Sequence, residues 1–204
     1  MVRQGKLELT WVGKDERPRL EPRVLIEDSS KSYGDPNTEN MLIFGDNLLA
    51  LKALEQKFAS KIKCIYIDPP FNTGQALEHY DDGLEHSIWL SLIANRVRIL
   101  HVLLSEEGTL FAHIDDNELG YFIVLLDEIF GRSNRLYVVT FKQGAATGHK
   151  SINPGCVNTS NFILIYAKDK NRWTPNRVYT ARERDVRYNQ NSLRIGQMIS
   201  KRGV

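Results

Sequence analysis

The chain has 204 residues, of which 42% are hydrophobic and 25% are charged, and its formal net charge is +2. This length is enough for one well-buried domain and part of a second, and the composition is ordinary for a globular protein. No apolar run approaches the ~20 residues needed to cross a bilayer, so we expect no membrane association. The two cysteines, Cys64 and Cys156, lie far apart and lack metal-ligand spacing, which indicates a reducing, cytoplasmic setting without disulfides or a metal site.

The charge is unevenly distributed along the chain. Residues 171–204 carry eight Lys or Arg side chains against two acidic ones, a net charge of +6, whereas residues 1–170 carry a net charge of −4. A basic segment of this kind can bind a polyanion such as DNA. On charge alone, a solvated surface segment is the simpler interpretation.

Residues 1–39 are interpreted as an N-terminal extension that precedes the main domain. Residues 6–12 and 23–27 alternate polar and apolar side chains like short half-buried strands, and prolines separate them. Residues 28–40 are rich in Ser, Asp, Asn, Gly and Pro, which is typical of a linker or loop.

A regular alternation of strands and helices begins at Asn40. The predicted elements are, in chain order, strand 41–44, helix 48–58, strand 62–67, helix 87–104, strand 109–114, a helix ending before Gly131, and strands 136–141 and 162–167. Because parallel strands need a crossover connection, this order predicts an α/β fold with a mostly parallel sheet and an antiparallel pair of strands at one edge. The continuous apolar run at 62–67 further predicts a strand that is covered on both faces.

Acidic residues stand where two of the predicted helices begin. Asp46 follows the first strand and is a candidate N-cap of the next helix. Asp115 or Asp116 is the candidate cap of the third helix, and Glu118 follows Asp115 by three residues, as in a capping box.

The segment Asp68-Pro69-Pro70-Phe71 directly follows the strand at 62–67. In an open α/β sheet, ligands bind at the carboxyl ends of the strands, which is where Asp68 is expected. Two prolines fix their own backbone dihedral angles and restrict the residue before each. The alternative interpretation is a proline-rich turn, but such a turn does not require an acid at this point.

These groups match the needs of a DNA base that carries an exocyclic amine. The carboxylate of Asp68 and the main-chain carbonyl of Pro69 can both accept hydrogen bonds from the amine. Phe71 offers a face on which a base can stack after it has left the double helix. Proline has no N–H, so the loop presents acceptors without competing donors.

Several motifs in sequence order resemble those of the DNA amino-methyltransferases of the permuted beta class, in particular the modification (Mod) subunits of type III restriction–modification systems. The motifs are Asn40 to Leu48, Ile65 to Gly74, His79 to Asp82, Trp89-Leu90, Leu103 to Gly108, Ile114 to Glu118, Asp127 to Gly131 and Ile165 to Lys168. The resemblance covers nearly the whole chain. It implies a partial Rossmann-like fold that depends on S-adenosylmethionine.

The activity implied by the resemblance is methyl transfer from S-adenosylmethionine to the exocyclic amine of adenine in double-stranded DNA. The family's catalytic residues carry over onto Asp68, Pro69, Pro70 and Phe71, although the family more often has Tyr at the last position. Asp rather than Ser at the first position favours adenine over cytosine. In the implied mechanism the lone pair of the amine attacks the methyl group directly, so positioning and electrostatics dominate and no metal is needed.

The resemblance also implies that the Asp46 carboxylate lies near the adenosine part of the cofactor and that Asp68 borders the cofactor. Candidate contacts to the substrate base or to DNA are Asn72, Tyr80, Lys142, His149 and Lys150. For Tyr80 a plain surface loop is the simpler interpretation, and for Lys142, His149 and Lys150 it is an equally simple one. His101 and His113 lie within predicted elements and are interpreted as packed or capped histidines.

The resemblance assigns residues 40–170 to the catalytic part of the methyltransferase domain and 171–204 to the beginning of a basic DNA-recognition region. The Gly-rich turn with which this class holds the methionine end of the cofactor is not found, so we expect a truncated fold with impaired activity. Expected partners are DNA and a complementary methyltransferase fragment, a second Mod subunit or a restriction subunit. The alternative function is a non-catalytic DNA-binding or assembly fragment. A phosphate-binding G-x-x-x-x-G-K-[ST] loop is absent from the sequence, which argues against a P-loop nucleotide-binding domain.

Overall fold

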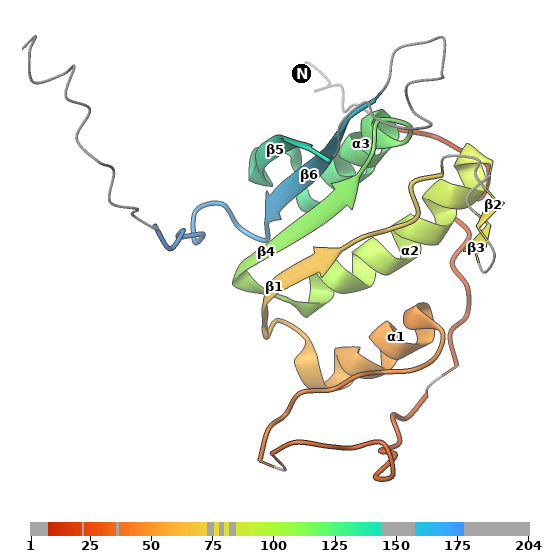
Figure 1. Cartoon of the computed structure of the whole chain (residues 1–204). Helices are drawn as coiled ribbons and strands as arrows, with labels where there is room; N and C mark the ends of the chain where they lie inside the picture. Colours follow the sequence, from red (N-terminus) through yellow and green to blue (C-terminus); the bar gives the residue numbers. More distant parts are fainter. Residues whose placement is uncertain are drawn as a thin grey trace, which may run out of the picture. The chain divides into compact units, whose positions relative to one another are not determined.

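The structure is a computed structural model and describes residues 8–21, 23–35, 37–72, 76–77, 80–81, 85–143 and 158–177. The helices are α1 (Asn47–Phe58), α2 (His86–Leu103), α3 (Leu119–Phe130) and the short 3-10 helix η1 (Arg132–Asn134). The strands are β1 (Ile62–Ile67), β2 (Ala76–Leu77), β3 (Tyr80–Asp81), β4 (Leu104–Ile114), β5 (Arg135–Lys142) and β6 (Ser160–Ala167) (Figure 1). All of these elements lie in a first unit, Met1–Trp173, and a second unit comprises Thr174–Val204.

The four longer strands form one mixed sheet in the order β1-β4-β6-β5. β1 is parallel to β4, whereas β6 is antiparallel to both of its neighbours. The predicted α/β class with an antiparallel pair at one edge is therefore confirmed. The strand expected at 41–44 is wrong, because these residues are irregular and Leu42 and Phe44 are fully exposed. As a result, the parallel part of the described sheet consists of β1 and β4.

Helices α2 and α3 cover one face of the sheet, and α1 lies beside α2 (Figure 1). α2 buries the stripe expected from its sequence, including Trp89, Ile93 and Val97. On the sheet side, Leu110 and Leu164 are fully buried in the same cluster. Each such side chain stabilises the fold by about 1.5–3 kcal/mol relative to its exposed state. None of the helices in the described part of the chain has the length and hydrophobicity needed to span a lipid bilayer.

The other face of the sheet is not covered by any described helix (Figure 1). Cys64 and Tyr66 of β1 and Tyr137 and Val139 of β5 are exposed. The expectation that strand 62–67 is covered on both faces is therefore wrong. A run of apolar residues shows that a strand can be buried, but it does not show how many layers the fold supplies.

Helix α2 passes directly into β4, five residues before the strand start expected at residue 109. β4 pairs with β1 from its first residue, and the register between them shifts after Ile62. At this irregularity, a Cβ atom added to Gly108 would lie 2.8 Å from the carbonyl oxygen of Ile62. Gly108 is thus required for the close approach of two backbones.

The N-terminal segment is docked onto the helices. The indole N–H of Trp11 donates to Ser91 Oγ of α2 at 2.8 Å, and the backbone N–H of Leu9 donates to Glu128 Oε1 of α3 at 2.6 Å. Burial opposes the charge of Lys14, but its hydrogen bonds to Glu8 and Glu128 outweigh burial and raise the pKa of Lys14. The strands predicted at 6–12 and 23–27 are wrong in their described residues, which are irregular. Here, side chains and not a neighbouring strand anchor the chain.

His101, in the last turn of α2, links the stability of the fold to pH. Burial and the nearby ammonium of Lys168 lower the pKa of His101 below its ordinary value of about 6.5. The ammonium Nζ lies 3.2 Å from Nδ1 of the ring, and Phe130 contacts the ring edge-on. The lowered pKa contributes stability that is fully present above about pH 6.5 and is lost as the pH falls through the folded-state value.

We therefore predict that His101→Gln reduces the loss of stability between about pH 7.5 and about pH 5.5. Urea denaturation at both pH values measures the effect. The control is Lys170→Gln, which changes an exposed side chain and should keep the wild-type dependence of stability on pH. Equal acid sensitivity of the wild type and His101→Gln would contradict the prediction.

Candidate functional site

Asp68 is the first residue after β1 and stands at the carboxyl end of the parallel pair. Its carboxylate is 62% exposed, whereas Pro69, Pro70 and Phe71 are half-buried. The predicted position of the acid at the carboxyl end of its strand is therefore confirmed. Its catalytic role, and those of the two prolines and Phe71, remain predictions.

The proline loop is held by a buried tryptophan. The Nε1–H of Trp89 in α2 donates to the carbonyl oxygen of Pro70 at 2.8 Å. Trp89 is fully buried and packs edge-on against Phe122 of α3. The Pro70 carbonyl is thus occupied and its position is tied to the hydrophobic core. Sequence reasoning placed Trp89 in the core stripe but did not find this contact.

A buried carboxylate joins the two ends of the segment that follows the loop. Glu118 is fully buried, and its Oε1 accepts a hydrogen bond from Asn72 Nδ2 at 2.5 Å and lies 2.6 Å from His86 Nδ1. Asn72 has a φ of +61°, a conformation that Asn tolerates better than most residues. Asn72 immediately follows Phe71, and His86 begins α2. Glu118 therefore connects the residue that follows the proline loop to the first residue of α2.

The expected capping box at α3 is wrong. Glu118 itself is the N-cap residue of α3 and makes no side-chain capping hydrogen bond. Asp115 instead accepts from the backbone N–H of Asn117. The side chain of Glu118 turns toward Asn72 and His86, whose nitrogen atoms supply the polar partners that a buried carboxylate needs.

His113 of β4 lies next to Asp68 because β1 and β4 are paired in register. Its Nδ1 is 3.1 Å from Asp68 Oδ1, and Phe71 contacts its ring edge-on at a centroid distance of 4.9 Å. Asn161 of β6 lies 3.0 Å from the other ring nitrogen, Nε2. The interpretation of His113 as a packed histidine is therefore incomplete, since the ring also contacts the candidate catalytic acid.

Asp46 is the N-cap of α1, as one of its two expected roles requires. Its Oδ1 accepts from the backbone N–H groups of Leu48 and Leu49. Arg96 Nη2 lies 3.9 Å from its Oδ2. The second expected role, contact with a cofactor, stays a prediction.

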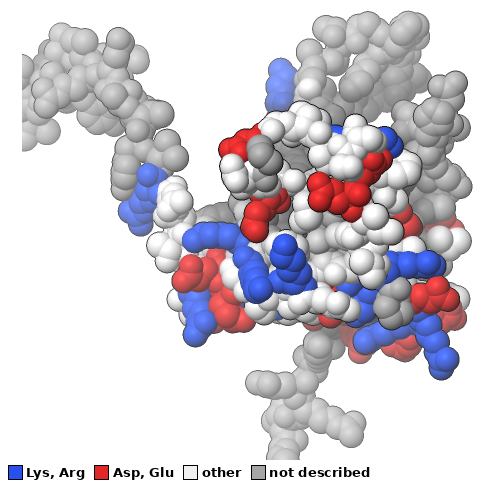
Figure 2. All heavy atoms as spheres, turned by 90° about the horizontal axis from the view of Figure 1, so that it is seen from below, with Lys and Arg blue, Asp and Glu red and all other residues white. Residues whose placement is uncertain are grey.

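The remaining predicted contacts to DNA are only partly described. Lys142 is exposed at the end of β5, and the backbone of Tyr80 belongs to β3. His149 and Lys150 lie outside the described residues, as does most of the basic segment 171–204. On the face shown in Figure 2, acidic and basic side chains are intermixed. Any contribution of the basic segment to DNA binding thus stays a prediction.

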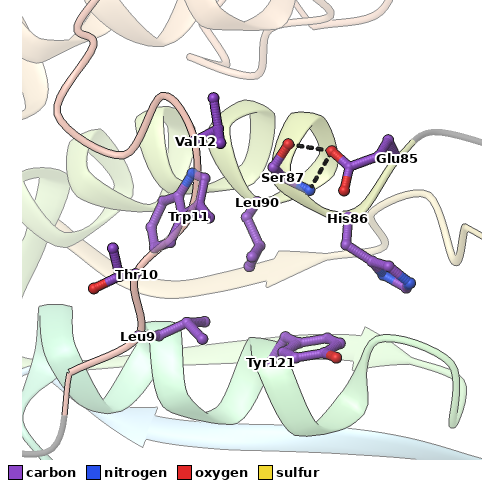
Figure 3. A pocket seen from close by; sticks show the side chains of 9 residues that line it. All are labelled: Leu9, Thr10, Trp11, Val12, Glu85, His86, Ser87, Leu90 and Tyr121. Carbon is purple, nitrogen blue, oxygen red and sulfur yellow. Dashed lines mark hydrogen bonds between the residues drawn. The ribbon is translucent and has the colours of Figure 1, made fainter.

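A hollow of about 480 Å³ lies between the N-terminal segment and helices α2 and α3. Figure 3 shows that Trp11 from the N-terminal segment, Leu90 from α2 and Tyr121 from α3 line it. None of Asp68 to Phe71 contributes to this hollow. Among the described residues, no group of His, Cys, Asp or Glu side chains is arranged to hold a metal ion. The candidate site at Asp68 thus lies outside this hollow.

A family model described as DNA methylase matches residues 62–200. The chain is 40% identical over 154 residues to the probable type III restriction-modification enzyme HindVI Mod subunit of Haemophilus influenzae, covering 74% of this chain and 20% of that protein. It is 33% identical over 198 residues to the EcoPI Mod subunit of Escherichia phage P1, covering 79% of this chain and 30% of that protein. The chain thus spans less than a third of the length of these relatives.

Among solved structures, the complex of M1.HpyAVI with SAM matches at 16% identity with a TM-score of 0.46, covering 69% of this chain and 60% of that chain. The region matched by the family model begins at β1. It includes Asp68 and all four strands of the larger sheet. The chain belongs to the DNA methylase family.

Proposed function

We propose that the chain forms the catalytic part of an enzyme that transfers a methyl group from S-adenosylmethionine to the exocyclic amine of adenine in DNA. The observation that carries this proposal is the accessible carboxylate of Asp68 at the end of β1, on a loop whose backbone is tied to the core. The sequence relationship to Mod subunits of type III restriction-modification enzymes supports the same activity.

The carboxylate of Asp68 would accept a hydrogen bond from the amino group of the base. Accepting this hydrogen bond draws the nitrogen lone pair away from the ring and makes the nitrogen a better nucleophile. The carbonyl of Pro69 is proposed as the second acceptor, since the next carbonyl, that of Pro70, is already bonded to Trp89. Phe71 is half-buried and would contact the flipped base next to these two acceptors. The catalytic contribution of these groups is positioning.

The residues present fit the proposed cofactor at Asp46. One oxygen of its carboxylate caps α1, and the other lies 3.9 Å from Arg96, beyond hydrogen-bond distance. The second oxygen can therefore accept from a hydroxyl group of a nucleoside. Asp46 would hold the adenosine part of S-adenosylmethionine, and Asp68 would border it. When bound, S-adenosylmethionine supplies an electrophilic methyl group.

Adenine is proposed over cytosine on the basis of Asp68. The family model covers N6 and N4 methylation, so membership alone does not select the base. Asp rather than Ser before the two prolines favours adenine, as the sequence resemblance implies. Analysis of the methylated nucleosides by chromatography separates N6-methyladenine from N4-methylcytosine.

The assignment of the remaining regions is part of the same proposal. Residues 40–170 form the catalytic part, 1–39 precede it as an extension, and the basic residues 171–204 begin a DNA-recognition region. The proposed partners are double-stranded DNA and, in the cytoplasm, a complementary methyltransferase fragment, a second Mod subunit or a restriction subunit.

A second candidate function is supported by the openness of the site. The carboxylate of Asp68 is 62% exposed, so the described residues do not enclose a base beside it. A chain of this kind could bind DNA or a partner without methylating the base. In that case Asp68→Ala leaves binding intact and methylation is absent from the wild type as well, alone or with a complementary polypeptide.

The first prediction for the reaction concerns Asp68. We expect Asp68→Ala to lower methyl transfer to unmethylated DNA by at least about 100-fold, because it removes a group placed at the reacting nitrogen. Transfer of a labelled methyl group is measured with the chain alone and with a polypeptide that supplies the rest of a Mod subunit. We expect weak or no transfer by the chain alone.

The matched control is Asp35→Ala, which removes an exposed aspartate of the N-terminal region. It should leave methyl transfer at the wild-type level. If Asp68→Ala and Asp35→Ala have the same activity as the wild type, Asp68 is not the acceptor and the proposed mechanism is wrong.

The second prediction for the reaction concerns Trp89. Trp89→Phe leaves the Pro70 carbonyl without its donor and should lower the free energy of unfolding by about 1–3 kcal/mol. It should also lower kcat at temperatures where the variant is folded, because the proline loop is no longer tied to α2. Trp11→Phe is the control, since it removes an indole donor to Ser91 that lies away from the loop. A kcat for Trp89→Phe equal to that of Trp11→Phe would contradict the prediction.

A further inference from the structure

Two polar side chains from neighbouring strands form a line that ends at the candidate catalytic acid, the first residue after a third strand. Asn161 of β6 lies 3.0 Å from His113 Nε2, and His113 Nδ1 lies 3.1 Å from Asp68 Oδ1. The strand pairing accounts for this order, because β4 lies between β1 and β6 in the sheet. The pairing of these strands therefore brings the three side chains together.

The members of the line become less buried toward Asp68. Asn161 is 3% exposed, the side chain of His113 is 13% exposed and that of Asp68 is 62% exposed. The ring of His113 contacts Phe71 at 4.9 Å and Phe141 at 5.3 Å between centroids. A ring with aromatic contacts and a hydrogen-bond partner at each nitrogen has little freedom to turn.

The hydrogen-bond partners determine where the ring hydrogen lies. The Nδ2 group of Asn161 can only donate a hydrogen bond, so His113 Nε2 must be the unprotonated nitrogen that accepts it. The hydrogen is then on Nδ1, which donates to the carboxylate of Asp68. Hydrogen bonds to an ionised acceptor are stronger than those between neutral groups. This bond uses Oδ1 and leaves Oδ2 of Asp68 for another donor.

We infer that His113, with its ring held by Asn161, is a positioning residue that orients the Asp68 carboxylate so that Oδ2 receives the amino group of the substrate base. This inference rests on the proposed function, which makes the amino group the partner of Asp68. His113 does not touch the base itself. It acts by fixing the orientation of the carboxylate and by leaving Oδ2 as the oxygen that accepts from the base.

The first test measures the ring tautomer of His113 in the full chain. Long-range nitrogen–hydrogen correlation spectra of the chain with ¹⁵N-labelled histidine distinguish the two tautomers, and the signal missing from His113→Gln identifies His113. We expect the Nδ1–H tautomer near neutral pH and a shift toward the Nε2–H tautomer in Asn161→Leu. An Nε2–H tautomer or a doubly protonated ring in the wild type would overturn the inference.

The second test separates positioning from packing. His113→Phe keeps a packed ring without hydrogen bonds and should lower kcat for methyl transfer by up to about 100-fold with little change in the KM for DNA. His113→Gln keeps a donor toward Asp68 and an acceptor toward Asn161, so it should restore part of that loss. His101→Gln, which alters another half-buried histidine away from the site, should keep the wild-type kcat.

The outcomes distinguish this inference from the proposed function. If Asp68→Ala is inactive while His113→Phe retains the wild-type kcat, the inference is wrong and the proposed function stands. If the wild type methylates no DNA even with a complementary polypeptide, the proposed function is wrong, while an Nδ1–H tautomer still supports the contact between His113 and Asp68.

Discussion

The hydrogen bond from Trp89 to the Pro70 carbonyl is the constraint on which the geometry of the site depends. Pro69 and Pro70 have no backbone N–H, so this part of the loop after β1 cannot be anchored by backbone donors of its own. A donor from elsewhere must hold it, and the indole of a fully buried residue in α2 does so. Because α2 packs against the sheet, the position of Asp68 is set by the hydrophobic core.

Much of the fold could be predicted from the sequence where a pattern is both long and periodic. The buried stripe of α2 and the abrupt end of β1 at Asp68 are examples, since each depends on local spacing alone. The strand at 41–44 and the double coverage of β1 were wrong for one shared reason. An apolar run shows that a segment can be buried, but neighbouring strands and layers decide whether it is, and Tyr66 and Phe44 are exposed.

The same limit applies to the site. The contiguous segment from Asp68 to Phe71 could be predicted because its chemistry is local. The contacts of Glu118 with Asn72 and of Asn161 with His113 join residues more than forty positions apart, so only the fold brings them together. One signal was available: His113 and Asn161 are polar residues within apolar strands, and a buried polar side chain requires a partner.

Two independent contacts hold Asp68, one through the loop backbone at Pro70 and one through the carboxylate at His113. In the proposed reaction, the orientation of the Asp68 carboxylate is therefore fixed before any other part of the protein covers the base. A polypeptide that closes over the exposed carboxylate would add recognition of the base and exclude water, and would not have to orient the acid. Excluding water lowers the local dielectric constant and strengthens the interaction between the carboxylate and the amine. In the proposed reaction, enclosure of the base would therefore strengthen hydrogen bonds whose geometry the sheet already provides.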